Sequence, residues 1–117
     1  MPIEQLELAA LRAAMAGPVP PTLVEALPEK YYRHAHLPGA KHLPHDQVAA
    51  LAPSTLPDRN APVVVYCASA TCRNSHIAAA ALADLGYAKV AVFAGGKQEW
   101  IAAGLKVESG AATASAA

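Results

Sequence analysis

The sequence has little of several features that would identify a protein class at once. Its 117 residues include two cysteines, one tryptophan and one phenylalanine, and nine Lys and Arg balance nine Asp and Glu. Two cysteines in a chain of this length cannot build the disulfide framework of a small secreted domain. Because nucleic-acid binders usually carry a basic patch and a high pI, a pI near 7.0 argues against such a partner.

Long hydrophobic runs and the pattern of a leader are also missing. The chain contains no stretch of about 18 consecutive apolar residues, so we expect no membrane-spanning helix and no membrane partner. Glu4 and Glu7 stand where a signal peptide would carry positive charge. These observations predict a cytoplasmic protein, and the length fits one domain.

Apolar periodicity and turn residues predict short helices and strands along the whole chain. Helices are expected over 3–16, 29–34, 45–51, 75–85 and 97–103, and strands over 22–27, 62–66 and 89–93. A turn is expected over 37–40, an extended piece from Leu43 onward and a Pro-rich loop over 52–62. The low-complexity segment 109–117 is expected to be a flexible tail, so residues 1–108 form a single domain.

The strands over 62–66 and 89–93 are the strongest of these predictions. Both are nearly continuous apolar runs, which is typical of strands buried on both faces in a parallel sheet. The helix over 75–85 lies between them, as in a right-handed βαβ unit. We therefore predict the α/β class, a three-layer domain with a mainly parallel central sheet and helices on both faces.

Cys67 directly follows the first of these strands and is the candidate nucleophile. Ligands of open α/β sheets gather at this carboxyl edge, and the backbone N–H groups of a curled loop before a helix can bind an anion there. Such a setting would lower the pKa of Cys67 and favour the reactive thiolate; the alternative is a cysteine that packs as a small apolar residue. The candidate anion-binding loop consists of Ala68, Ser69, Ala70, Thr71, Cys72 and Arg73.

Two residues of this loop have more specific candidate roles. Arg73 lies six residues after Cys67, a spacing that can return its guanidinium to the rim of the loop. Cys72 is a candidate resolving thiol that would form a disulfide with Cys67, and packing at the helix start is its alternative role. Asn74 or Ser75 is expected to cap the following helix.

The histidines do not form a metal-binding pattern. Four of them fall between positions 34 and 45, but without the ligand spacing of a zinc site, so we expect no metal. His36 is instead expected to stabilise the following Pro-Gly turn by hydrogen bonding. Trp100 is expected to pack in the core between the last helix and the sheet.

The order of several short motifs resembles that of the rhodanese domain. The resemblance covers roughly residues 3–107 and rests on His36-Leu37-Pro38-Gly39-Ala40, Tyr66-Cys67, Leu82 with Gly86-Tyr87, and Gly95-Gly96 with Trp100. It implies a rhodanese-like sulfurtransferase in which the Cys67 thiolate takes a sulfur atom from an anionic donor such as thiosulfate. The resulting persulfide would pass that sulfur to cyanide or to a small-molecule or protein thiol, without a cofactor.

Two departures from the family pattern leave other functions open. The spacing from Cys67 to Arg73 is similar to the longer loop of the related dual-specificity phosphatases and arsenate reductases, although Tyr66 replaces their histidine. The segment 25–27 replaces the usual Asp-x-Arg and so lacks an arginine. The alternatives to a sulfurtransferase are therefore a phosphatase or arsenate reductase on the same fold, or a non-catalytic rhodanese-like binding or sensing module.

Overall fold

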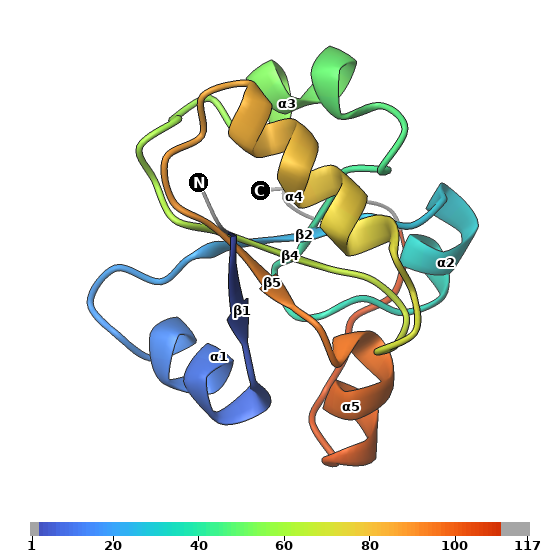
Figure 1. Ribbon diagram of the computed structural model, residues 1–117. Coiled ribbons are helices and arrows are strands. Elements are labelled where there is room, and N and C mark those ends of the chain that lie inside the picture. Colours follow the sequence, from blue (N-terminus) through green and yellow to red (C-terminus); the bar gives the residue numbers. More distant parts are fainter. Residues whose placement is uncertain (1–2, 111–117) are drawn as a thin grey trace.

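Five short strands pair side by side in one sheet, and all of them run parallel (Figure 1). The computed structural model describes residues 3–110. The spatial order is β1-β5-β4-β2-β3. The strands are β1 (Glu4–Leu6), β2 (Thr22–Glu25), β3 (Lys41–His42), β4 (Val63–Tyr66) and β5 (Val90–Phe93). The parallel pairing of β4 with β5 confirms the predicted α/β class.

Helices cover both faces of this sheet. They are α1 (Leu8–Met15), α2 (Glu29–His34), α3 (Val48–Thr55), α4 (Asn74–Asp84) and α5 (Gly96–Ala102). Helices α3 and α4 lie on one face, and α1 and α5 lie on the other (Figure 1). Strand β4 serves both layers because its side chains alternate: Val63 and Val65 pack toward α3 and α4, whereas Val64 and Tyr66 pack toward α1 and α5.

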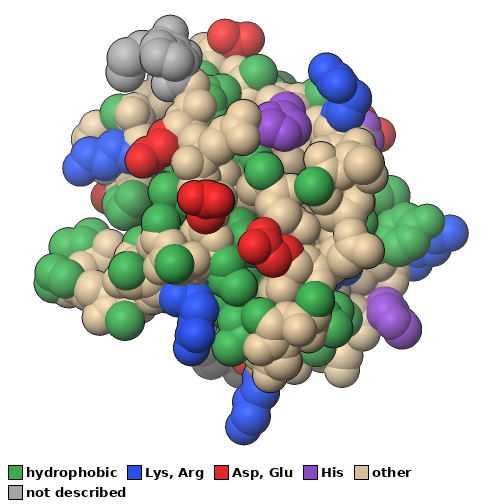
Figure 2. Space-filling view, turned by 60° about the horizontal axis from the view of Figure 1, so that its bottom comes forward, with side chains coloured by type: hydrophobic (Ala, Val, Ile, Leu, Met, Phe, Trp, Pro, Cys, Tyr) green, Lys and Arg blue, Asp and Glu red, His purple; other side chains and the backbone are tan. Residues whose placement is uncertain are grey.

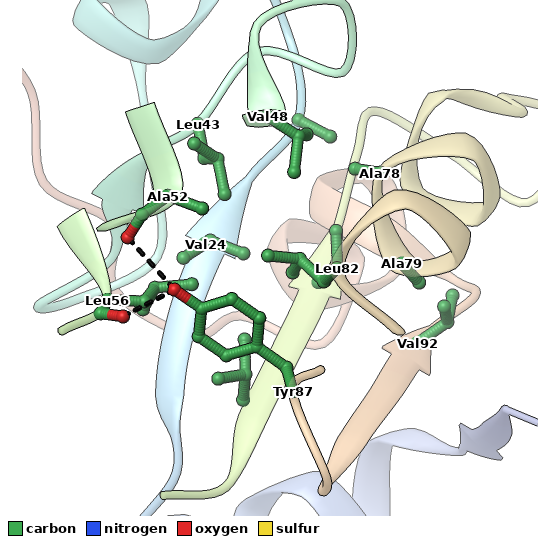
Figure 3. Close-up of a cluster of buried hydrophobic side chains, with 13 residues drawn as sticks. Val24, Leu43, Val48, Ala52, Leu56, Ala78, Ala79, Leu82, Tyr87 and Val92 are labelled. Atoms are coloured by element: carbon green, nitrogen blue, oxygen red, sulfur yellow. Dashed lines mark hydrogen bonds between the residues drawn. The ribbon is translucent and has the colours of Figure 1, made fainter. Parts of the chain in front are cut away.

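Tyr87 closes the core beneath α3 and α4 (Figure 3). Its ring is 5% exposed. Its hydroxyl lies 3.1 Å from the carbonyl oxygen of Ala52 and 2.5 Å from that of Leu56. Ala52 lies in the last turn of α3, and Leu56 directly follows this helix. Tyr87 therefore joins the end of α3 to the segment that follows α4.

The prediction of one helix over 3–16 was wrong at its beginning. Residues Glu4–Leu6 form β1, which pairs with β5 in parallel, and the helix begins only at Leu8. Glu7 between them has an extended backbone, with φ −88° and ψ 168°. The side of β5 that does not pair with β4 offers backbone hydrogen bonds to β1. The apolar periodicity of residues 3–16 does not reveal this pairing, because it depends on a distant strand.

The region between β2 and β4 also differs from the prediction. The expected helix over 45–51 is found at Val48–Thr55, so it extends into the expected loop and contains Pro53. Val48, Ala52 and Leu56 are all buried at helical spacing, and this burial outweighs the local preference against proline. The extended piece expected from Leu43 is β3, two residues earlier, because Lys41 and His42 pair with β2.

Two further expectations concern the C-terminal segment 109–117 and membrane-spanning helices. Gly110 is the last described residue, and its N–H donates to the carbonyl of Arg33 at 2.8 Å. Residues 111–117 of the expected tail lie outside the described residues. Within 3–110, none of the helices has the length and apolar character needed to cross a membrane.

The surface carries charges of both signs. Figure 2 shows one face of the molecule, on which Lys and Arg side chains are interspersed with Asp and Glu and with apolar side chains. No continuous basic patch occupies the face shown there, in keeping with the balanced composition.

Replacing Tyr87 by phenylalanine should lower the free energy of unfolding by about 1–3 kcal/mol, because the buried carbonyl of Leu56 loses its hydroxyl donor and that of Ala52 keeps only the N–H of Leu56. The measurement is urea unfolding at constant m value. Tyr31→Phe is the matched control, since the Tyr31 side chain is 46% exposed and its loss of a hydroxyl should change stability by under about 0.5 kcal/mol. Equal losses in both variants would show that the contacts of Tyr87 with α3 contribute no special stability.

Candidate active site

Cys67 is the first residue after β4, and the loop over 68–73 leads from it into α4. The Cys67 side chain is 1% exposed. Ala68, Ala70, Thr71 and Arg73 are exposed above it. The loop is turned tightly enough for the N–H of Cys72 to donate to the carbonyl of Ser69 at 3.1 Å. The structure thus places the predicted nucleophile beneath the predicted loop.

The immediate surroundings of the Cys67 sulfur come from the loop and from the first turn of α4. Its Sγ lies 3.4 Å from the hydroxyl of Ser75 and 3.4 Å from the carbonyl oxygen of Cys72. Burial raises the pKa of Cys67, the contact with Cys72 raises it further, and hydrogen bonds from Ser75 only partly oppose this. The expectation that the site lowers the pKa of Cys67 was therefore wrong.

Cys72 explains this difference. Partial burial alone would raise the pKa of Cys72, but hydrogen bonds from Cys67 and from the backbone N–H groups of Ala68 and Asn74 outweigh it, so the pKa is lowered. Backbone N–H groups of Ala68 and Asn74 thus favour the thiolate of Cys72, and the backbone N–H of Ser75 favours that of Cys67. The sequence predicted such groups for Cys67 alone.

The helix after β5 holds the loop backbone from the other side. The N–H of Lys97 donates to the carbonyl of Cys67 at 2.9 Å, and the N–H of Gln98 donates to the carbonyl of Ala68 at 2.8 Å. Gly96 allows this approach because a Cβ there would lie 2.4 Å from the Cys67 carbonyl oxygen. Its φ of +65° also favours glycine. The Gly95-Gly96 motif therefore has a defined structural task.

A buried polar network lies under the site and joins β2, β4 and α5. Glu25 is 0% exposed. One of its carboxylate oxygens accepts a hydrogen bond from the hydroxyl of Tyr66 at 2.9 Å, and the other lies 3.1 Å from the ammonium group of Lys97. The Tyr66 hydroxyl in turn accepts the N–H of Leu37 at 3.0 Å. Tyr66 precedes Cys67 in the chain, so the network anchors the end of β4.

Burial and the neighbouring groups shift the pKa values of Glu25 and Tyr66. Burial raises the pKa of Glu25, and the positive charge of Lys97 and the hydrogen bond from Tyr66 offset part of that rise. Burial and the neighbouring carboxylate raise the pKa of Tyr66, so its hydroxyl stays protonated and able to donate. Sequence reasoning missed Lys97. Its position just after Gly95-Gly96, at the same sheet edge as Glu25, is the signal that could have found it.

The remaining residues of the sequence prediction have mixed outcomes. No side chain caps α4: Arg73 occupies the capping position without a side-chain hydrogen bond, and Ser75 is buried against Cys67 instead, so the capping prediction was wrong. Arg73 is exposed, and its carbonyl accepts the N–H of Ile77 at 3.1 Å. Trp100 packs in the core as expected, and its indole N–H donates to the carbonyl of Lys106 at 2.7 Å.

His36 does not hold the Pro-Gly turn as predicted. Its buried ring stacks on Tyr32 with centroids 3.9 Å apart, and its Nδ1 lies 2.8 Å from the Tyr32 carbonyl oxygen. The turn is closed by the N–H of Ala40, which donates to the carbonyl of Leu37 at 3.0 Å, and the carboxylate of Glu108 accepts the N–H of Gly39 at 3.0 Å. In the part of the chain that the structure describes, no three His, Cys, Asp or Glu side chains are arranged to hold a metal ion.

Comparison with known proteins agrees with this geometry. The family model for the rhodanese-like domain matches residues 7–103. The structure of a thiosulfate sulfurtransferase from Pseudomonas aeruginosa superposes with a TM-score of 0.80 at 28% identity, over 92% of this chain and 20% of that one. The structure of a rhodanese with anions from E. coli gives a TM-score of 0.64 at 27% identity, over 76% of this chain and 98% of that one.

One similar protein is named as a transcriptional regulator and not as an enzyme. An HTH-type transcriptional regulator of Mycobacterium tuberculosis is 36% identical over 101 residues, which is 86% of this chain and 42% of the regulator. This chain therefore spans less than half the length of that relative. The match over residues 7–103, with a parallel sheet that presents Cys67 at its carboxyl edge, shows that the chain belongs to the rhodanese-like domain family.

Proposed function

We propose that this chain is a sulfurtransferase that carries sulfane sulfur on Cys67. The observation that carries the proposal is the position of this thiol at the carboxyl end of β4, beneath a loop of small residues that α5 holds by its backbone. The similarity to a thiosulfate sulfurtransferase supports the reaction class. A small anionic sulfur donor and a thiol acceptor are the partners that this chemistry requires.

The proposed reaction has two displacement steps. The Cys67 thiolate attacks the outer sulfur of thiosulfate, the S–S bond of the donor breaks, and sulfite leaves with the bonding electron pair. A thiolate or cyanide then attacks the outer sulfur of the persulfide and restores the Cys67 thiolate. The hydroxyl of Ser75, 3.4 Å from the Cys67 sulfur, stabilises the thiolate in both steps.

A regulatory domain is the second candidate function, because the curated relative is a transcriptional regulator of more than twice the matched length. In that role the same thiol would report on a sulfur donor without repeated transfer to an acceptor. Multiple turnover with thiosulfate and cyanide separates the two candidates. Continued formation of thiocyanate supports the enzyme, and a chain that keeps one added sulfur atom without forming thiocyanate supports the sensor.

Cys67→Ser should abolish sulfite release from thiosulfate, because it removes the attacking thiol. Cys72→Ser is the matched control and should keep this first step. Since the pKa of Cys67 is raised, its thiolate fraction grows with pH, and the rate should still be increasing above the ordinary pKa of a thiol. The measurements are sulfite release and intact mass at several pH values. Retained sulfite release in Cys67→Ser would assign the nucleophile to another residue.

Arg73→Ala should weaken the use of an anionic donor, because an exposed guanidinium at the loop rim can contact the donor's charge. Such a contact contributes about 1.5–3 kcal/mol, so kcat/KM for thiosulfate should fall about tenfold to hundredfold. An uncharged persulfide donor should lose much less. Lys89→Ala is the control, because this exposed lysine precedes β5 at the opposite edge of the sheet. Equal losses with both donors would mean that Arg73 acts on the loop rather than on the donor.

Gly96→Ala should disturb the loop far more than Gly104→Ala. Both glycines have positive φ, +65° and +80°, so each substitution carries a backbone penalty of about 1–2 kcal/mol. A Cβ at Gly104 meets nothing within 4 Å, whereas one at Gly96 would collide with the carbonyl oxygen of Cys67. Only Gly96→Ala should slow sulfite release, by about tenfold or more. Similar rates in the two variants would show that the approach of α5 to the loop does not matter for the reaction.

A further inference from the structure

Cys72 is a second thiol next to the first. The Cys67 Sγ lies 3.4 Å from the Cys72 carbonyl oxygen, so the side chain of Cys67 contacts the backbone of Cys72. Both cysteines are free thiols. A disulfide requires an S–S distance of about 2.05 Å, and a movement of the loop around Cys72 would bring its sulfur to the Cys67 Sγ.

The loop stabilises the negatively charged form of Cys72. Backbone N–H groups of Ala68 and Asn74 point at its sulfur from both ends of the loop. These hydrogen bonds, together with the one from Cys67, outweigh the effect of partial burial and lower the pKa of Cys72. A lowered pKa favours the thiolate of Cys72, which is the form that an attacking thiol needs.

The two thiols also differ in accessibility. Cys67 is 1% exposed, and Cys72 is half-buried in the loop above it. A sulfur atom carried on Cys67 would lie close to Cys72, whose carbonyl oxygen is 3.4 Å from the Cys67 Sγ. This proximity favours a reaction between the two residues.

We infer that Cys72 resolves the Cys67 persulfide and releases its outer sulfur as hydrosulfide. This inference rests on the proposed function. The Cys72 thiolate attacks the inner sulfur, which belongs to Cys67, and the Cys67–Cys72 bond forms. The bond to the outer sulfur breaks, and that atom leaves with the electron pair and its proton. The sulfane sulfur is reduced, the two cysteines are oxidised to a disulfide, and a small-molecule or protein dithiol reopens it.

The test is a single turnover of the full chain with thiosulfate, without reductant or acceptor. The wild type should release about one equivalent each of sulfite and hydrosulfide and lose the mass of two hydrogen atoms as the disulfide forms. Cys72→Ser and Cys72→Ala should still release about one equivalent of sulfite, but they should release no hydrosulfide and gain the mass of one sulfur atom. Cys67→Ser should do none of these.

The outcomes separate this inference from the proposed function. If the wild type releases sulfite but keeps the added sulfur, as the Cys72 variants do, the resolving role is wrong and sulfur transfer stands. Peptide mapping that finds the added sulfur on Cys72 also overturns the inference, because the sulfur then moved instead of leaving. If no form of the chain releases sulfite, both proposals are wrong. Should the Cys72 variants fail to fold, the wild-type products alone decide between disulfide and persulfide.

Discussion

The buried pair of Glu25 and Lys97 is the interaction on which the arrangement of the site depends. Glu25 at the end of β2 is fully buried, and a carboxylate in that position is costly unless a cation and further hydrogen bonds accompany it. Lys97 supplies the cation from α5 at 3.1 Å. Its ammonium group also donates to the carbonyls of Tyr31 at 3.0 Å and Ala35 at 2.7 Å. Removing either charge would leave the other buried without its partner, which typically destabilises a protein by about 3–5 kcal/mol.

This pair connects the sheet to the reactive loop through two separate contacts. Tyr66 donates to Glu25 and is covalently joined to Cys67, so the end of β4 has one orientation. The backbone N–H of Lys97 donates to the Cys67 carbonyl, so the residue that neutralises Glu25 also holds the loop. The beginning of the loop is therefore well anchored. Ala70, Thr71 and Arg73 further along the loop are exposed to solvent, which is where a donor would arrive.

Glu25 has a cationic partner although residues 25–27 depart from the family pattern. The arginine usual in that motif is missing, and the chain has Leu27 in its place. The cation for Glu25 comes instead from Lys97, a residue 72 positions away in the sequence. The positive charge next to Glu25 thus comes from a helix that begins at the same edge of the sheet, and no short sequence window contains both residues.

The sequence by itself determined the parts of the protein that depend on local composition. The runs at β4 and β5 are apolar throughout because both faces of these strands are buried, and the small residues over 68–71 allow the turn that follows Cys67. Strand order, the edge strand β1 and the helix through Pro53 depended on partners distant in the chain. Tertiary structure alone also decided the direction in which the pKa of each thiol is shifted. A pKa responds to the direction of a few hydrogen bonds and to burial, and neither follows from the spacing of residues along a chain.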